Sequence, residues 1–221
     1  MSFTRQLISN FAANASVENA KPMAAYMKDN FDFLGIKAQD RKELFKQVLQ
    51  LNKTEVKEDF RSIAKSLYAM PEREYQYCAV DMLVKHWPKH FIQQDIELIE
   101  YFIVTKSWWD SVDPLAKYVL GGYLKQFPDE TDHVVERFAK SENMWMNRSA
   151  ILFQLGYKKE TDAALLFSLC DNFSYSKEFF IQKAIGWALR EYAKTNADTV
   201  REFVNTANLK PLSVREALKN I

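Results

Sequence analysis

Apolar residues recur every three or four positions along almost all of this 221-residue chain. That is the period of an α-helix, in which such positions share one face that can be buried against a neighbour. Only five glycines occur, and runs of β-branched residues are few. The pattern predicts an all-α fold, with helices near residues 2–13, 18–28, 38–51, 54–68, 72–86, 91–104, 111–125, 129–140, 143–155, 161–171, 176–194, 197–206 and 212–220.

Three of these helices have a hydroxyl residue near their predicted start. The hydroxyl residues are Thr54, Ser111 and Ser176, one at the start of each of these predicted helices. A hydroxyl oxygen can accept a hydrogen bond from one of the free backbone N–H groups of the first turn. We therefore predict that these residues cap their helices, and that Pro114 occupies a first turn, where its missing N–H matters little.

The second half of the chain contains regular intervals. A spacing of 34 residues relates three positions that begin small-then-large apolar segments, namely Ala116, Ala150 and Ala184. A spacing of 35 residues relates three charged positions, namely Asp113, Arg148 and Lys183. Either interval has room for two helices and two turns, the size of a HEAT-like repeat. We predict a curved solenoid forming one domain over residues 1–221, with a plain helical bundle as the alternative.

The charge distribution and the absence of long apolar runs limit the possible functions. The first 110 residues contain 15 Lys and Arg against 15 Asp and Glu, and the remainder contain 15 against 14. Any nucleic-acid surface must therefore be segregated locally, because neither half is basic overall. Charged residues interrupt every apolar stretch before it reaches the length of a membrane span. We expect no membrane association.

Cysteine and histidine residues give no sign of a metal or disulfide framework. Cys78 and Cys170 lie 92 positions apart in apolar helical segments, which is typical of reduced core residues in a cytoplasmic protein. His86 and His90 have the spacing of metal ligands, but Pro88 interrupts the helix that would align them. We predict no metal and no organic cofactor.

The predicted helix 176–194 combines positive charge with an aromatic ring. Steps of 4, 3 and 4 residues place four side chains on one stripe, namely Lys183, Trp187, Arg190 and Lys194. Basic groups can follow phosphates, while an indole face can contact a sugar, a base or a cation. The alternative is a solvated basic face with Trp187 packed against a neighbouring helix, and the sequence does not decide between the two.

A second candidate site combines Trp109 with Asp113, four positions later. Both side chains can face one space, where the indole and the carboxylate would attract a cation. The alternative is that Asp113 stabilises the helix start and that the tryptophans are core residues. Arg148 could hold a phosphate or pair with a carboxylate such as Asp113. We predict that four phenylalanines are packing residues, namely Phe31, Phe33, Phe179 and Phe180.

Six segments together resemble the AlkD-type DNA alkylation repair enzymes, and the resemblance spans nearly the whole chain. They are Lys21–Lys28, Phe33–Ile36, Leu67–Glu74, Val104–Asp113, Ala150–Leu155 and Ser176–Trp187. The most specific strings are Lys-Ser-Trp-Trp-Asp-Ser-Val-Asp and Lys-Glu-Phe-Phe-Ile-Gln-Lys-Ala-Ile-Gly-Trp.

The resemblance implies a right-handed solenoid of HEAT-like helix pairs, with a basic concave groove for duplex DNA. It also implies a glycosylase that releases cationic N3- and N7-alkylpurines, with the lesion left stacked in the duplex. The family's catalytic cluster corresponds to Trp109, Asp113 and Trp187. Tyr26 and Arg148 correspond to residues of the nearby cleft.

The resemblance is weaker for other DNA contacts. Three residues resemble a DNA-contacting region with shifted spacing, namely Lys37, Arg41 and Lys42. Gly156 stands where the family has a basic residue, so this phosphate contact is either missing or supplied by Lys158. With the stripe of Lys183, Arg190 and Lys194, these complete the predicted DNA-binding set.

We expect Asp113 to stabilise the sugar cation that forms during cleavage and to position a water molecule. Trp109 and Trp187 would border the sugar, and Arg148 would hold a phosphate or orient Asp113. The expected partner is alkylated duplex DNA, bound by a monomer. Two alternatives are a non-catalytic module that binds DNA structures and a helical scaffold that binds proteins.

Overall fold

The structure is a computed structural model that describes residues 2–219. Helices account for the regular structure of this part of the chain, and its only β-type pairing is an isolated bridge between Asp32 and Glu72. The predicted all-α class is therefore confirmed. The chain forms two compact units that divide between His90 and Phe91, so the single domain over residues 1–221 stays a prediction. No helix within residues 2–219 is long and apolar enough to cross a membrane.

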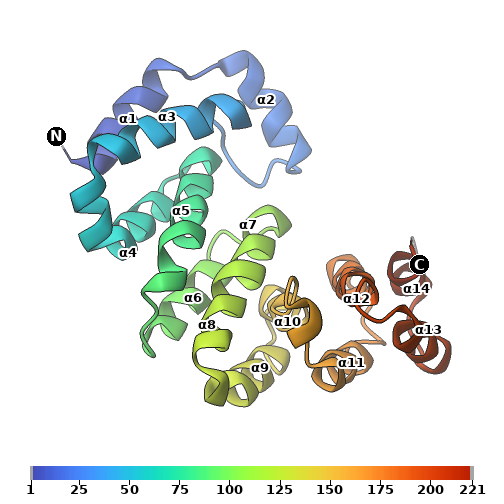
Figure 1. The fold of residues 1–221 in the computed structure, drawn as a ribbon. Helices are drawn as coiled ribbons and strands as arrows, with labels where there is room; N and C mark the ends of the chain where they lie inside the picture. The colour runs from blue at the N-terminus through green and yellow to red at the C-terminus, as the bar shows by residue number, and fades with distance from the viewer. Residues whose placement is uncertain (1, 220–221) are drawn as a thin grey trace. The chain divides into compact units, whose positions relative to one another are not determined.

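Five α-helices and a short 3₁₀ turn make up the first unit (Figure 1). They are α1 (Phe3–Ala13), α2 (Val17–Tyr26), α3 (Ala38–Leu51), α4 (Lys53–Ala69), α5 (Arg73–His86) and the turn Trp87–Lys89. Helix α1 packs against α3 and α4, while α4 and α5 lie side by side. The helical spacing of Phe3, Leu7 and Phe11 places all three side chains in the core, where they are fully buried.

A buried carboxylate fixes the loop between α2 and α3. Glu74 is fully buried and accepts hydrogen bonds from the backbone N–H groups of Leu34, Gly35 and Ile36 at 2.9–3.1 Å. Gly35 has a φ of +84°, and a Cβ there would lie 2.0 Å from the carbonyl oxygen of Ser16. Only glycine fits this close left-handed turn. The segments Phe33–Ile36 and Leu67–Glu74 are therefore parts of one local structure.

Figure 1 shows the helices of the second unit in two rows. The unit contains α6 (Asp95–Val104), α7 (Trp109–Pro114), a π-helical segment (Leu115–Leu120), α8 (Gly121–Gln126), α9 (Thr131–Ala139), α10 (Met144–Leu152), α11 (Ala163–Asn172), α12 (Phe179–Ala193), α13 (Ala197–Thr206) and α14 (Pro211–Ala217). Helix α10 contacts α7 and α12, and α12 contacts α14. Helices α9, α11 and α13 form the other row and alternate with these along the chain. This alternation agrees with repeated helix pairs, and Ala116, Ala150 and Ala184 are all fully buried.

Three of the predicted helix starts differ from the structure by one to three residues. Helix α4 begins at Lys53, before Thr54, and α12 begins at Phe179, three residues after Ser176. Helix α7 already begins at Trp109, because the backbone N–H groups of Ser111 and Val112 both bond the carbonyl of Trp108. Ser111 therefore lies inside the helix, where its buried hydroxyl donates to that same carbonyl at 3.2 Å.

The helical run from α7 to α8 contains an irregular middle section. Pro114 lies at the end of α7 rather than in its first turn, so the prediction for this residue is also wrong. The next six residues, Leu115–Leu120, are π-helical. Proline cannot donate the regular backbone bond, and a wider π-helical turn is one way for a helix to continue past such a position. The π-helical segment therefore begins two residues after Asp113.

Candidate active site

A cavity of about 350 Å³ in the second unit is lined by all three predicted catalytic residues, Trp109, Asp113 and Trp187. Four elements supply its walls, namely α7, α10, α12 and α14, with Glu216 as the contribution of α14. The lining side chains are Trp109, Asp113, Arg148, Phe179, Phe180, Lys183, Trp187, Arg190 and Glu216. We call this space the Asp113 cavity. Residues 113, 148 and 183 all line it, so the 35-residue interval relates positions that share one site.

Asp113 and Arg148 form a two-pronged ion pair in this cavity. Arg148 donates from Nε to Oδ1 of Asp113 at 2.8 Å and from Nη2 to Oδ2 at 2.9 Å. The side chains of Asp113 and Arg148 are 13% and 5% exposed, respectively. Arg148 also donates from Nη1 to the backbone carbonyl of Phe180. These bonds fix the guanidinium between α7 and α12, so it holds the carboxylate in one orientation.

Burial and hydrogen bonding act in opposite directions on Asp113. Burial is the largest effect and raises the pKa of this carboxyl above its ordinary value. The hydrogen bonds and the charge of Arg148 lower the pKa, while the nearby Asp110 raises it slightly further. Both carboxylate oxygens accept hydrogen bonds from Arg148, which is the arrangement that an ionised carboxylate favours. The group is therefore a negative charge with little water around it.

Glu216 was not found by sequence reasoning, and it balances two charges of the predicted basic stripe. Its Oε1 lies 3.0 Å from Lys183 Nζ, and its Oε2 lies 2.9 Å from Arg190 Nη1. Arg190 also donates to the backbone carbonyl of Glu216 at 2.8 Å. The hydrogen bonds of Lys183 and then Arg190 hold the pKa of Glu216 at about 2. The cavity thus contains two carboxylates, each paired with cationic side chains.

A close helix contact brings Glu216 to this position. A Cβ on Gly186 would lie 2.4 Å from Cβ of Glu216 and 2.9 Å from the carbonyl oxygen of Ser213. The missing side chain lets α14 approach α12 directly. Ser213 also donates from Oγ to the carbonyl of Gln182 at 3.0 Å. The glycine of the Ile-Gly-Trp string therefore helps to build the cavity wall beside Trp187.

The two adjacent tryptophans have different surroundings. The Trp108 ring packs against Phe180 and Trp145, with centroid distances of 5.2 and 5.7 Å. Trp109 lines the cavity instead, one turn before Asp113. Before this pair, Lys106 adopts a left-handed φ of 46°, and Ser107 Oγ donates to the carbonyl of Ile103 at 2.6 Å. This turn between α6 and α7 directs the two rings into different environments.

The packing role predicted for Phe179 is wrong. Its side chain lines the Asp113 cavity and is 58% exposed, too much for a core residue. Phe180 also lines the cavity, although its ring packs against Trp108 and Trp145 as well. Helical spacing identifies apolar residues but does not distinguish the rim of a cavity from the core. Phe179 therefore adds an exposed aromatic ring to the site.

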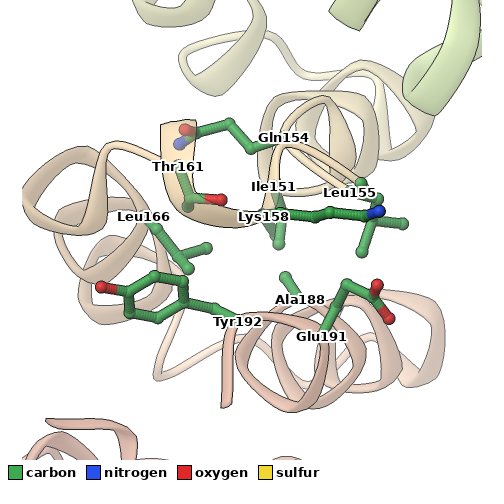
Figure 2. Close-up of a pocket in the computed structure, with 10 residues that line it drawn as sticks. Ile151, Gln154, Leu155, Lys158, Thr161, Leu166, Ala188, Glu191 and Tyr192 are labelled. Carbon is green, nitrogen blue, oxygen red and sulfur yellow. The ribbon is translucent and has the colours of Figure 1, made fainter. Parts of the chain in front are cut away.

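The structure places the other predicted DNA-binding residues away from this lining. Lys194 is exposed and pairs with Glu191 at 2.6 Å. Lys158 is exposed and borders a crevice of about 10 Å³ with Leu155 and Glu191 (Figure 2). A space of that size holds no more than about one water molecule, so we assign it no ligand.

The first unit contains the remaining predicted DNA contacts. Tyr26, Lys37 and Lys42 are exposed. Arg41 is buried instead, because its Nη1 lies 2.8 Å from Asp81 Oδ2 and its guanidinium stands over the ring of Tyr77 at 5.0 Å. The guanidinium of Arg41 is therefore engaged within the protein. The spacing of basic residues in the sequence did not indicate this internal pairing. Contact between Arg41 and DNA stays a prediction.

Comparison with known proteins identifies the family. The family model described as DNA alkylation repair enzyme matches residues 7–221. A solved structure described as a predicted DNA alkylation repair enzyme from Enterococcus faecalis is 37% identical, with a TM-score of 0.85 over 94% of this chain and 96% of that one.

More distant solved structures share the fold. AlkD2 from Streptococcus mutans is 18% identical, with a TM-score of 0.61 over 90% of this chain and 96% of that one. The smu.31 protein from Streptococcus mutans UA159 is 19% identical, with a TM-score of 0.61 over 81% and 92%. A comparison with curated proteins finds no match. The family model and the 37% identical structure each cover nearly the whole chain, and the chain therefore belongs to the DNA alkylation repair enzyme family.

Proposed function

We propose that this protein is a DNA glycosylase that hydrolyses the N-glycosidic bond of cationic N3- and N7-alkylated purines in duplex DNA. One observation carries the proposal. The Asp113 cavity combines a largely buried carboxylate, fixed by two hydrogen bonds from Arg148, with the indole rings of Trp109 and Trp187. A fixed negative charge beside aromatic rings is suited to stabilise positive charge that develops on a sugar.

The proposed reaction begins with a substrate that is already a good leaving group. An alkyl group on N3 or N7 gives the purine a formal positive charge. When the bond between C1′ and the purine breaks, its electron pair returns to the purine ring and neutralises that charge. The sugar is left as an oxocarbenium-like cation. Water then forms a bond to C1′ and loses a proton, and the products are a neutral alkylpurine and an abasic site.

Asp113 would act on the sugar rather than on the base. Its ionised carboxylate would stabilise the cation and orient the attacking water. Arg148 would keep the carboxylate in place, as its hydrogen bonds to Oδ1 and Oδ2 already do. Trp109 and Trp187 would cover the sugar and exclude bulk water, which strengthens the field of the carboxylate. No step requires a protein group to protonate the leaving base.

Lys183 and Arg190 would hold the backbone phosphates beside the lesion. In the structure both cations are paired with Glu216. A phosphate that approaches them must compete with this carboxylate. The pairing would weaken binding to undamaged DNA and keep both cations aimed into the cavity. The exposed residues that we assign to further backbone contacts are Tyr26, Lys37, Lys42, Lys158 and Lys194.

We propose that the lesion remains stacked during the reaction. Enzymes that flip a base usually recognise its Watson–Crick edge through hydrogen bonds. The described residues that line the Asp113 cavity include no side-chain amide and no hydroxyl, and both oxygens of Glu216 are already paired. This lining is better suited to a sugar and its phosphates than to a base. Selectivity would then follow from the charge of the purine and the lability of its bond.

The test is product analysis on a methylated duplex. The proposal predicts that the protein releases free 7-methylguanine and creates an equal number of abasic sites. An unmethylated duplex should yield neither product. Salt-sensitive DNA binding without base release above the spontaneous rate would refute the glycosylase and favour a non-catalytic DNA-binding module. Absence of any salt-sensitive DNA binding would favour a scaffold for proteins.

A further inference from the structure

The first unit contains a cationic cavity that the proposed reaction does not use. It has a volume of about 460 Å³ and lies where the end of α3 meets the start of α4 and the end of α5. Its lining residues are Lys46, Leu49, Gln50, Lys53, Val56, Lys57, Lys85 and His86. Four of these eight side chains are lysines and none is a carboxylate. We call this space the lysine cavity.

The four lysines are not neutralised by carboxylates. All four are exposed, and no ion pair involves any of them within the part of the chain that the structure describes. Some lysines elsewhere are paired, such as Lys125 with Glu160 at 2.5 Å and Lys194 with Glu191 at 2.6 Å. The lysine cavity therefore concentrates positive charge in a protein whose net charge is only +1.

The charge composition of the first unit agrees with a local excess of positive charge. Residues 1–90 contain 14 Lys and Arg against 11 Asp and Glu, although the whole chain is nearly balanced. Three of the acidic residues are engaged elsewhere. Glu74 binds backbone N–H groups, Asp81 pairs with Arg41, and Glu55 accepts from the N–H of Phe3.

The arrangement of these lysines is unfavourable for the isolated protein. Lys53 and Lys57 are four residues apart on α4, a spacing at which like charges destabilise a helix. His86 also lines the cavity, and its Nε2 is buried and makes no hydrogen bond among residues 2–219. A bound anion would relieve the repulsion of the lysines. A group of positive charges around one concave space has the features of an anion-binding site.

We propose that the lysine cavity binds phosphate groups of a nucleic-acid backbone. Phosphates are the anions that lysine side chains recognise as point charges, without a need for planar geometry. The half-buried Leu49 adds apolar surface that a deoxyribose can cover. The inference rests on the proposed function only for the source of the phosphate, which is a DNA duplex. It assigns these lysines no role in the chemical step.

The experiment measures how binding to an undamaged duplex depends on salt. The test variant is Lys57→Gln/Lys85→Gln, and the matched control Lys125→Gln/Lys140→Gln removes the same charge from two lysines that are paired with Glu160 and Glu136. The slope of log K against log salt is negative, and each phosphate contact that is lost reduces its magnitude by about 0.9. The inference predicts that the magnitude of the slope decreases by about 2 in the test variant and stays near the wild-type value in the control. Lys57→Arg/Lys85→Arg should retain the wild-type slope.

Equal slopes for the wild type, test variant and control would overturn the inference. A second arm titrates the wild type and the test variant with sodium tripolyphosphate in the absence of DNA. If only tripolyphosphate binding depends on these lysines, the ligand is a small polyphosphate and the DNA assignment is overturned. Base release with equal slopes would refute this inference alone. A reduced slope without base release would refute the glycosylase and leave the lysine cavity as a DNA contact.

Discussion

Asp113 and Arg148 lie 35 residues apart in the chain, and in the structure they form a two-pronged ion pair in one cavity. Burial raises the pKa of Asp113, and Arg148 opposes that effect. The ionised form of Asp113 therefore depends on Arg148. In our proposal that ionised form stabilises the sugar cation, so the pair connects the fold to the pH dependence of the reaction.

We predict that the wild-type rate of base release rises with pH and levels off above the pKa of Asp113. Because burial raises this pKa, the rise should lie above the ordinary range of an aspartate. Glu216 should add no step in the working range, because its pKa is about 2. Single-turnover rates measured between about pH 4 and 9 check this, with the spontaneous loss of methylated bases subtracted at each pH. A flat profile would show that the carboxylate does not take part.

Arg148→Lys should move that pH profile to higher pH. Lysine retains the positive charge but cannot donate two parallel hydrogen bonds to a carboxylate. The pKa of Asp113 should rise further, and each unit of increase lowers the ionised fraction about tenfold at pH values below it. We expect the loss of rate to be largest at low pH, with partial recovery at high pH. A uniform loss at every pH would indicate that Arg148 binds phosphate and does not position Asp113.

Glu216→Gln should strengthen DNA binding while it weakens the fold. The substitution removes a carboxylate that pairs with Lys183 and Arg190, so both cations become available to phosphates. We expect a steeper salt dependence and a lower free energy of unfolding at pH 7, by about 1–3 kcal/mol. The pKa of Glu216 is lowered from 4.5 to about 2, so its stabilising effect is present above pH 4.5 and is lost as the pH falls towards 2.

Denaturant unfolding of the wild type and Glu216→Gln at several pH values tests the stability effect. The difference between the two proteins should shrink as the pH approaches 2. Glu191→Gln is a suitable control, because Glu191 pairs with the exposed Lys194 and contributes little on the protein surface. If Glu216→Gln weakened DNA binding, the carboxylate would be needed to orient the two cations.

Gly186→Ala should loosen the contact between α12 and α14. The added Cβ would lie 2.4 Å from Cβ of Glu216 and 2.9 Å from a backbone oxygen, so α14 must shift. We expect a destabilisation of about 1–3 kcal/mol, larger than the helix-propensity gain of alanine, together with reduced base release. Thermal unfolding and single-turnover rates measure the two effects.

Gly122→Ala is a matched control for that substitution. Gly122 also lies in a helix, but a Cβ there would meet only the Phe91 ring, at 3.1 Å. An aromatic ring can move by a few tenths of an ångström, and alanine favours the helix by up to about 1 kcal/mol. We expect little change in stability. Equal effects of the two substitutions would show that the close approach at Gly186 is unimportant.

Local sequence patterns were sufficient to predict the helices and part of the site. The predicted segment 38–51 has the same bounds as α3, and 197–206 has the same bounds as α13. In both cases the amphipathic period extends over the whole helix and ends at a clear boundary. The 35-residue interval was informative for the same reason. Stacked helix pairs bring equivalent positions to one surface, and Asp113, Arg148 and Lys183 occupy such positions.

Features that depend on packing between helices were not predictable. Continuing the 35-residue interval from Lys183 leads to Leu218, two positions beyond Glu216. The position of Glu216 depends instead on how closely α14 approaches Gly186. The burial of Arg41 likewise depends on Asp81, which lies on a different helix. Charge spacing along one helix contains no information about either partner.

The most direct test of the account is single-turnover release of 7-methylguanine by the wild type and by Asp113→Asn. Asp110→Asn serves as the control, because Asp110 lies in the same helix but does not line the cavity. We predict that Asp113→Asn lowers the rate by about 100-fold or more, while DNA binding and the Asp110→Asn rate remain close to wild type. A wild-type rate of release by folded Asp113→Asn would contradict the proposed mechanism.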